Sequence, residues 1–225
     1  MITIYVENTI LDTLKSFRLG IIQAVAKCKH SSPELHGLIQ ITVCRLMNQY
    51  TLENIKKIGT IAAAREAYRK MGNDPNRYRP AADSLIRHIV KGMGLNSVND
   101  IVDVLNIVSV SSGFSISGFD VEKVAGKVCL GIGQSGEPYR GIGREEVNIN
   151  KLPVLRDQLG AFGSPTSDSE QTMITLESEN IIFVFYDLGN DTDLEPAIKY
   201  CHDLILKYCS AKEFHSEVRL FEKNA

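Results

Sequence analysis

The turn GNDPNRYRP at residues 72–80 constrains the fold more than any other segment, because a glycine and two prolines cannot continue a helix interior. It separates two segments with helical periodicity, one at about 52–70 and one beginning just after Pro80. In the second segment an apolar stripe recurs at helical spacing, formed by Ala82, Leu85, Ile86, Ile89, Val90 and Met93. The sequence therefore predicts two helices joined by this turn.

Helical and strand patterns occupy different parts of the chain. Further helices are expected from Pro33, with Ser31 or Ser32 as the N-cap, and from about Leu194 to Cys209. Runs rich in β-branched and aromatic residues predict strands at 2–6, 101–110, around 127–132, at 172–176 and at 181–187. This distribution predicts an α+β fold with a central β layer flanked by helices.

We expect residues 1–225 to form one domain. Its parts are an N-terminal strand and helices (1–60), a core region (61–190), and a C-terminal helix with a polar tail (191–225). With 225 residues, of which 44% are hydrophobic and 23% charged, the chain can bury a full core. The five cysteines form no C-x-x-C pair, so the pattern indicates neither a zinc ribbon nor a disulfide framework and fits a reducing cytoplasm.

Several functional classes are disfavoured by context. The start lacks a basic segment followed by an apolar one, and no run reaches the ~18 apolar residues of a membrane span, so we expect a cytoplasmic protein without a membrane partner. The segment GIGQSG at 131–136 matches G-x-G-x-x-G, but Glu137-Pro138-Tyr139 follows it where a dinucleotide site needs a helix. The histidines show no H-x-x-x-H spacing. We therefore expect neither a metal nor another cofactor.

Local charge leaves RNA binding open. The net charge of −2 argues against tight, sequence-blind binding to nucleic acid, because that affinity comes mainly from lysine and arginine. Between Arg65 and Lys91, however, seven basic residues stand against three acidic ones. We expect Arg79, Arg87 and Lys91 to share an exposed basic face that meets RNA phosphates. The alternative is an ordinary solvated helix face.

Two segments resemble a known family. VDVLN at 102–106 and GFSISGFD at 113–120 resemble the V-D-x-x-N segment and the G-x-P-x-H-A-F-D-like turn that open the B3/B4 domain of the bacterial phenylalanyl-tRNA synthetase β subunit. QLGAFGSPTSDSEQTMITLESENI at 158–181 is similar to the glycine turn and the T-x-N-x-x-L-E strand of that domain. The resemblance covers roughly residues 65–187. It implies a freestanding B3/B4-type protein, without room for a complete tRNA ligase.

The resemblance also assigns candidate site residues. It implies catalytic roles for Asn106 and Ser117. It implies a substrate-binding set of Ser109, Gly160, Phe162, Gly163 and Glu177. Asn106 matches an asparagine of the family's editing pocket, and Glu177 matches the glutamate that recognises the hydroxyl of a wrongly attached tyrosine, so we expect both in one cavity. Ser117 stands where the family has a histidine, which removes an imidazole that would bind or orient water.

Structural alternatives apply to the same polar residues. Asp103 and Asp120 fit strand ends or turns, where they would bind backbone N–H groups. Glu177 fits a surface charge at a strand end. Asn106 and Ser109 interrupt a buried-looking run, and such groups need partners inside the fold or in a ligand.

The function implied by the resemblance is hydrolysis in trans of the aminoacyl ester of a mischarged tRNA, with tyrosyl-tRNA specific for phenylalanine as the first substrate to test. Its partners would be tRNA and the aminoacyl group. The alternative is a module that keeps the pocket without the chemistry and binds RNA, an amino acid or another metabolite. The serine at position 117 favours this alternative.

Overall fold

The strands form two four-stranded sheets in the computed structural model, which describes residues 2–143, 146–189 and 193–223. The central sheet has the order β3-β7-β2-β8 and is antiparallel throughout. Its strands are β2 (Ser16–Val25), β3 (Ser115–Asp120), β7 (Asn180–Asp187) and β8 (Lys212–Glu222). The second sheet has the order β1-β4-β5-β6, with a parallel β1–β4 pair. Its strands are β1 (Ile4–Val6), β4 (Val128–Ile132), β5 (Pro153–Arg156) and β6 (Ala161–Gly163).

Six α-helices pack around these sheets within the described part of the chain. They are α1 (Asn8–Leu14), α2 (Pro33–Gln49), α3 (Gly59–Lys70), α4 (Ala81–His88), α5 (Asp100–Ser112) and α6 (Glu195–Tyr208). A π-helical segment, η2 (Ile89–Met93), extends α4, and 3-10 turns occur at Ile55–Lys57, Val121–Lys123 and Glu170–Thr172. No helix in the described ranges carries an apolar run long enough to cross a membrane.

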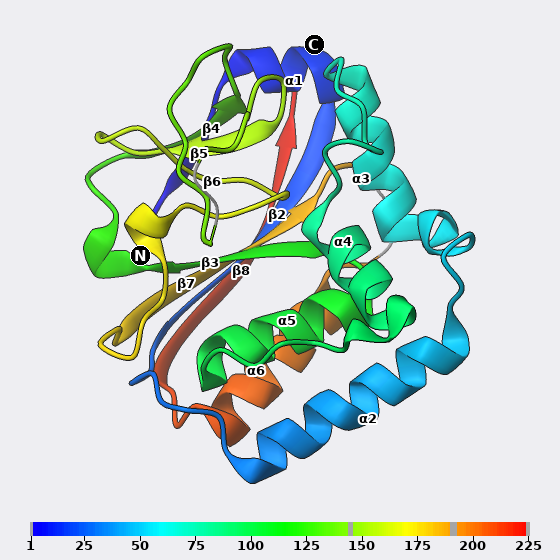
Figure 1. Cartoon of the computed structure of the whole chain (residues 1–225). Coiled ribbons are helices and arrows are strands. Elements are labelled where there is room, and N and C mark those ends of the chain that lie inside the picture. The colour runs from blue at the N-terminus through cyan, green and yellow to red at the C-terminus, as the bar shows by residue number, and fades with distance from the viewer. Residues whose placement is uncertain (1, 144–145, 190–192, 224–225) are drawn as a thin grey trace.

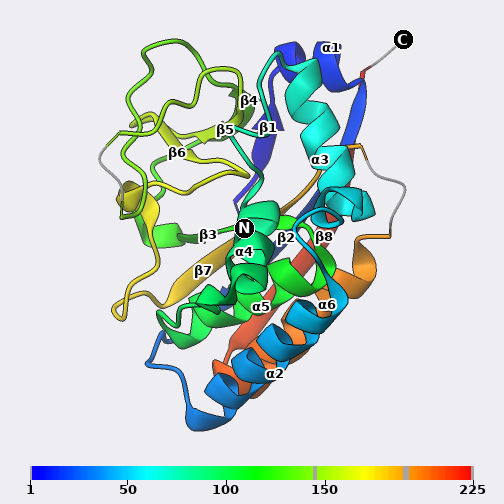
Figure 2. The same ribbon diagram turned by 45° about the vertical axis from the view of Figure 1, so that its right-hand side comes forward.

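The central sheet is covered on both faces. Helices α2, α4, α5 and α6 lie on one face, and the second sheet lies on the other (Figures 1 and 2). Strand β7 shows the division, because successive side chains of a strand point to opposite faces. Ile181, Phe183 and Phe185 pack into the core under the helices. Ile182, Val184 and Tyr186 pack toward the second sheet. The α+β class and the central β layer are therefore confirmed, with helices on one face and a sheet on the other.

The expected N-cap of α2 is resolved in favour of Ser32. Its Oγ accepts a hydrogen bond from the Leu35 N–H at 3.2 Å, and Pro33 occupies the first turn. Ser31 instead donates to Asp103 Oδ2 at 2.6 Å, linking the start of α2 to α5.

The strand expected at 101–110 is wrong, because this segment is helix α5. Asn99 caps its start by accepting a hydrogen bond from the Val102 N–H at 2.9 Å. Gly113 ends it with φ of 76°, a left-handed conformation that suits glycine. Since α5 is buried around most of its circumference, its apolar residues form a nearly continuous run that looks like a buried strand.

Other differences concern the ends and edges. The expected strand at 172–176 is absent from the described structure, where a 3-10 turn at Glu170–Thr172 leads into extended chain. Strand β2 was not expected, and the expected polar tail contains β8, whose charged residues hide its β pattern. The segment at 131–136 completes β4 and enters a turn, as its proline context predicts.

A buried ion pair joins α3 to α4. Arg65 Nη1 lies 2.7 Å from Asp83 Oδ2, and the two side chains are only 5% and 0% exposed. Arg65 also donates to the Pro75 carbonyl at 2.9 Å and to Asn76 Oδ1 at 2.6 Å, which fixes the intervening turn. Arg87 Nε adds a second contact to Asp83 Oδ1 at 2.6 Å. The turn predicted from glycine and proline is thus held by one arginine.

We expect Arg65→Ala to lower the free energy of unfolding by about 3–5 kcal/mol, because it leaves the buried Asp83 carboxylate with only half of its charge partners. Arg69→Ala is the matched control, since Arg69 lies one turn further along α3 in an exposed pair with Glu66 at 2.9 Å. Its loss should cost about 0–1 kcal/mol. Urea denaturation of both variants checks the difference, and equal losses would contradict the role of the pair.

Candidate active site

A cleft of about 400 Å³ lies between α4, α5, β3 and the loop at 164–174. We call it the Asp168 cleft. Its apolar wall contains Ala81, Leu85, Val98, Val102, Leu105, Ile116, Ile142, Met173 and Ile174. Its polar groups come from Ser84, Asn106, Ser164, Thr166, Ser167 and Asp168, with Gly118 at the strand. A mainly apolar pocket with a few converging polar groups is the usual form of a ligand site.

Asp168 is the central polar group of the cleft. Its Oδ1 accepts a 2.6 Å hydrogen bond from Ser117 Oγ, and its Oδ2 accepts a 3.2 Å bond from the Gly118 N–H. A side chain at residue 118 would collide with α5, because a Cβ there would lie 2.6 Å from Leu105 Cδ1. Glycine therefore lets α5 approach β3 and leaves the backbone N–H available to the carboxylate.

A chain of hydroxyl groups continues behind Asp168. Tyr186 OH lies 3.1 Å from Ser117 Oγ. Since the serine has one proton and makes its shortest contact with Asp168, the tyrosine is the donor of this pair. Two other tyrosines hold the loop, because Tyr139 OH donates to the Ser167 carbonyl at 2.5 Å and Tyr68 OH lies 2.8 Å from Thr166 Oγ1. The loop is thus fixed by tyrosine hydroxyls from α3 and from the segment between β4 and β5.

The environment changes the acidity of these groups. Burial raises the pKa of the Asp168 carboxyl to about 7, while hydrogen bonds from Ser117 and Gly118 act in the opposite direction by favouring the carboxylate. Burial, together with the nearby Asp168 charge, also raises the pKa of Tyr186 and Tyr139. A carboxyl group that titrates near neutrality in a cleft is a candidate proton acceptor.

Asn106 lies on the opposite wall of the same cleft. Helix α5 places it one turn from Val102 and next to Leu105, so that these three residues line the cleft together. Its half-buried amide makes no hydrogen bond to the described residues. A ligand in the cleft would find one amide and one carboxyl group facing a shared space.

The sequence that forms this cleft matches a known protein family. The model of the family described as "B3/4 domain" matches residues 63–210, which is more than half of the chain and includes every element of the Asp168 cleft. The chain belongs to the B3/4 domain family.

The chain is also similar to parts of two longer proteins. The phenylalanine–tRNA ligase beta subunit of Wolbachia sp. subsp. Brugia malayi (strain TRS) is 29% identical over 98 residues, which are 40% of this chain and 12% of that subunit. An N-terminal fragment of the phenylalanyl-tRNA synthetase beta subunit from Pyrococcus horikoshii is 15% identical, with a TM-score of 0.48, over 96% of this chain and 54% of the fragment. This B3/4 chain therefore spans only part of the length of either relative.

The structure separates the expected catalytic and substrate-binding residues. Ser117 lies directly behind the cleft, bound to Asp168. Ser109 lies one turn beyond Leu105 and Asn106 on α5 but does not line the cleft. It is buried and donates to the Phe114 carbonyl at 2.8 Å, so its hydroxyl serves the end of the helix. Asp103 and Asp120 bind backbone N–H groups, of Val98 at 2.9 Å and Glu122 at 3.0 Å, which agrees with their structural interpretation.

The expected glycine turn lies apart from the Asp168 cleft. Phe162 is buried and packs edge-to-face on Phe119 with ring centroids 4.9 Å apart. Gly163 lies under the same ring, because a Cβ there would be 2.4 Å from Phe119 Cζ. These two residues therefore serve the packing of the second sheet against β3. Gly160 lines another cleft.

Glu177 does not line the cleft that contains Asn106. It is exposed in the turn before β7, where its N–H lies 3.4 Å from Thr175 Oγ1. The strand that was expected to carry Glu177 inward is replaced by this turn. The structure therefore does not bring Asn106 and Glu177 together in one cavity.

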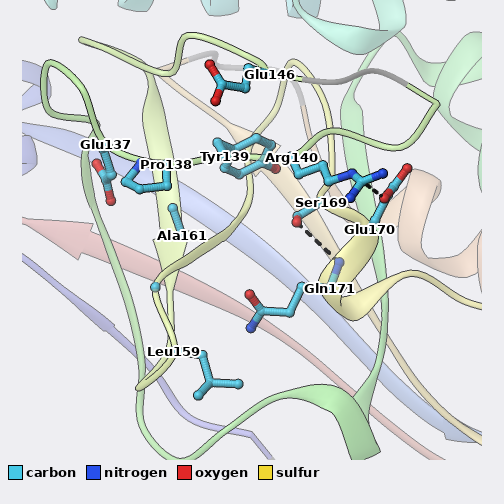
Figure 3. Close-up of a pocket in the computed structure, with 11 residues that line it drawn as sticks. Glu137, Pro138, Tyr139, Arg140, Glu146, Leu159, Ala161, Ser169, Glu170 and Gln171 are labelled. Atoms are coloured by element: carbon cyan, nitrogen blue, oxygen red, sulfur yellow. Dashed lines mark hydrogen bonds and ion pairs between the residues drawn. The ribbon is translucent and has the colours of Figure 1, made fainter.

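The cleft lined by Gly160 is larger and more polar (Figure 3). It measures about 1210 Å³ and is bordered by Glu137, Pro138, Tyr139, Arg140, Glu146, Leu159, Ala161, Ser169, Glu170 and Gln171. Most of its charged side chains form ion pairs within the protein. Arg140 pairs with Glu170 at 2.9 Å, and Glu137 receives Arg156 at 2.6 Å. It offers fewer free polar groups than the Asp168 cleft despite its size.

The three expected RNA contacts have different environments. Arg87 is held by Asp83 and by the Leu52 carbonyl at 3.1 Å, so its guanidinium is committed to the fold, contrary to its expected place on a free basic face. Lys91 is exposed on η2, and Arg79 is half-buried at the end of the turn at 72–80. Only these two remain available for a phosphate.

Sequence reasoning missed Asp168. It lies 51 residues after Ser117 in a loop that interrupts the family resemblance, and no spacing rule connects the two. No group of three or more histidine, cysteine, aspartate or glutamate residues in the described ranges has the geometry of a metal site.

We expect the folded Asp168 carboxyl to titrate with a midpoint of about 7, compared with about 4 in the unfolded chain. Between these values the folded state retains a proton that the unfolded state releases, so stability falls as the pH rises from about 4 to about 7. The Asp168→Asn variant should lack this dependence of stability on pH. Carbon NMR of the carboxyl and urea denaturation across this range test the expectation, with Asp203→Asn on the exposed face of α6 as the control.

Proposed function

We propose that this B3/4 domain hydrolyses the aminoacyl ester of a mischarged tRNA in the Asp168 cleft. The observation that carries the proposal is the pairing of a carboxyl group of near-neutral pKa with Ser117, in a cleft that also presents the free amide of Asn106. Relatives named as phenylalanine–tRNA ligase beta subunits support a substrate related to tRNA. We further propose that residues 1–225 act as one unit, since the central sheet contributes to both cores. We place the site of action in the cytoplasm as part of the same proposal.

Asp168 would act as the general base. In its carboxylate form it accepts a proton from a water molecule as the water oxygen attacks the ester carbonyl carbon. The carbon–oxygen bond to the ribose then breaks, and the proton returns from Asp168 to the leaving ribose oxygen. Free amino acid and tRNA with its terminal hydroxyl restored are the products.

Ser117 and Asn106 would support this step in different ways. Ser117 donates to the carboxylate and orients it, with Tyr186 behind it as a further donor. Asn106 can donate from its amide to the ester carbonyl, where negative charge develops. Asp168 thereby supplies the base that the serine at position 117, where the resemblance places a histidine, cannot provide.

The apolar walls favour an apolar or aromatic aminoacyl group. Leu85, Leu105 and Ile116 border the cleft from three different elements. Polar groups of the same cleft, such as Ser84, can bond a hydroxyl on that aminoacyl group, and a polar group left unpaired costs about 1–3 kcal/mol. Tyrosyl-tRNA specific for phenylalanine is therefore the first substrate to test.

We expect the purified protein to deacylate this tRNA faster than spontaneous hydrolysis, with a rate that rises with pH through the titration of Asp168 and then levels off. Asp168→Asn should reduce kcat by about 10²–10⁴-fold, as removal of a general base does. Asn106→Ala should reduce kcat by at least about tenfold, through loss of a carbonyl donor. Release of radiolabelled amino acid measures both effects.

The control is Asp203→Asn, which makes the same chemical change on an exposed residue of α6. Full activity of Asp168→Asn, with an unchanged pH profile, would rule out Asp168 as the base.

We also propose that Arg79 and Lys91 contact tRNA phosphates beside the cleft. The double variant Arg79→Glu/Lys91→Glu should lower tRNA affinity at moderate salt, and the slope of log affinity against log salt should decrease by about 1 per contact removed. Filter binding measures the slope. Lys127→Glu is the control, because Lys127 is exposed before β4 and lies over the Tyr5 ring. Equal losses from both variants would contradict a specific contact.

A second candidate is a binding module for a free amino acid. The absence of an imidazole at Ser117 favours it, because Asp168 could equally hold the ammonium group of an amino acid without activating water. Such a module would show a ligand-dependent rise in melting temperature and no release of amino acid from any charged tRNA. The Asp168→Asn variant would then lose the thermal shift.

A further inference from the structure

Strand β8 forms an edge of the central sheet. It pairs with β2 along one side, and no described residue pairs with its other side. With 11 residues it is the longest strand in the described ranges, and six of its residues are exposed. Figure 2 shows it beyond β2, away from the second sheet. An unprotected edge of this length offers a row of unpaired N–H and C=O groups to another strand.

The regular part of β8 is centred on Val218. Glu213 has φ of 51°, and the pairing with β2 shifts register at Ala24 and Val25, so regular geometry extends over residues 214–222. Glu217 and Arg219 lie on either side of Val218 and point to the same face, with Arg219 Nε 2.8 Å from Glu217 Oε1. That oxygen is buried, and its contact with Arg219 is an ion pair without hydrogen-bond geometry.

Pairing of β8 with a second copy of itself would be antiparallel about a two-fold axis through one residue. An axis at Val218 would place Glu217 opposite Arg219 of the copy, and this contact would occur twice. An axis at Glu217 would oppose two glutamates, and an axis at Arg219 would oppose two arginines. Since like charges directly opposite are destabilising, the charges select the Val218 register over its two neighbours.

We propose that β8 pairs with β8 of a second copy about a two-fold axis at Val218, so that the two central sheets join into one. Each copy contributes Glu217 and Arg219 to a square of alternating charges at the centre of the interface. Arg219 of the copy adds a second cationic partner to Glu217, which already pairs with Arg219 of its own strand. Leu220, which is 57% exposed, faces the helix side of the joined sheets and is partly covered by the copy.

The same charges explain how the edge avoids general aggregation. Charged side chains on an edge strand disfavour pairing with arbitrary strands. Opposite signs two residues apart favour self-pairing at Val218 over the two adjacent registers, because those registers bring like charges together. The edge is therefore protected and selective at once.

Analytical ultracentrifugation across a wide concentration range tests the proposal. Wild type should show a reversible monomer–dimer equilibrium that weakens between about 0.1 M and about 1 M salt. Arg219→Glu should raise the dimer Kd at least about tenfold, because each central pair becomes repulsive. The double variant Glu217→Arg/Arg219→Glu should restore dimerisation, since it exchanges the charges and keeps every pair opposite.

Lys199→Glu, on the exposed face of α6, is the control for charge reversal outside the edge. Hydrogen exchange should show concentration-dependent protection at alternate amides of residues 214–222. A wild type that stays monomeric, or a dimer unaffected by Arg219→Glu, would overturn the proposal. So would a folded double variant that remains monomeric.

Discussion

The structure depends on burial of the central sheet on both of its faces. Strand β7 lies inside this sheet, with Phe183 and Phe185 under the helices and Val184 and Tyr186 under the second sheet. Such a strand has no solvated side, and a polar group in it or beside it must find a partner within the protein. The hydroxyls of Tyr186 and Ser117 satisfy this condition by binding each other and Asp168. The sandwich geometry thus directs the hydroxyl chain between β3 and β7 toward the Asp168 cleft.

The candidate site is assembled from segments far apart in sequence. Asn106 comes from a helix, Ser117 and Gly118 from the strand after it, and Asp168 from a loop 50 or more residues later. None of these groups is unusual alone. Their combination places a carboxyl of raised pKa in one apolar cleft with an amide that bonds no described residue, which is the arrangement expected of a proton-transfer site. In the larger polar cleft of Figure 3, Arg140 pairs with Glu170, and Glu137 pairs with Arg156 outside the cleft.

Local signals predicted part of this structure well. The cap at Ser32, the turn at 72–80 and the strand at 181–187 each follow from rules that act within a few residues. The sequence misled where burial erased periodicity, since α5 is apolar on most sides and resembles a strand. It was silent where tertiary contacts decide, as for Asp168. Asn106 was found through family resemblance, whereas Arg87 was misassigned because its partner, Asp83, becomes buried only in the folded state.

The ion pair between Arg65 and Asp83 determines how a ligand can reach the cleft. Helix α4 carries Ser84 and Leu85 on one wall of the cleft. It cannot move outward without breaking the Arg65–Asp83 ion pair, which would cost about 3–5 kcal/mol. The opposite wall, at 164–174, is held by hydroxyl contacts such as Tyr68 with Thr166, worth about 0.5–1.5 kcal/mol each. A ligand would therefore enter and leave on the loop side. Helix α4 forms the fixed wall, and transient breaking of the tyrosine hydrogen bonds lets the loop move.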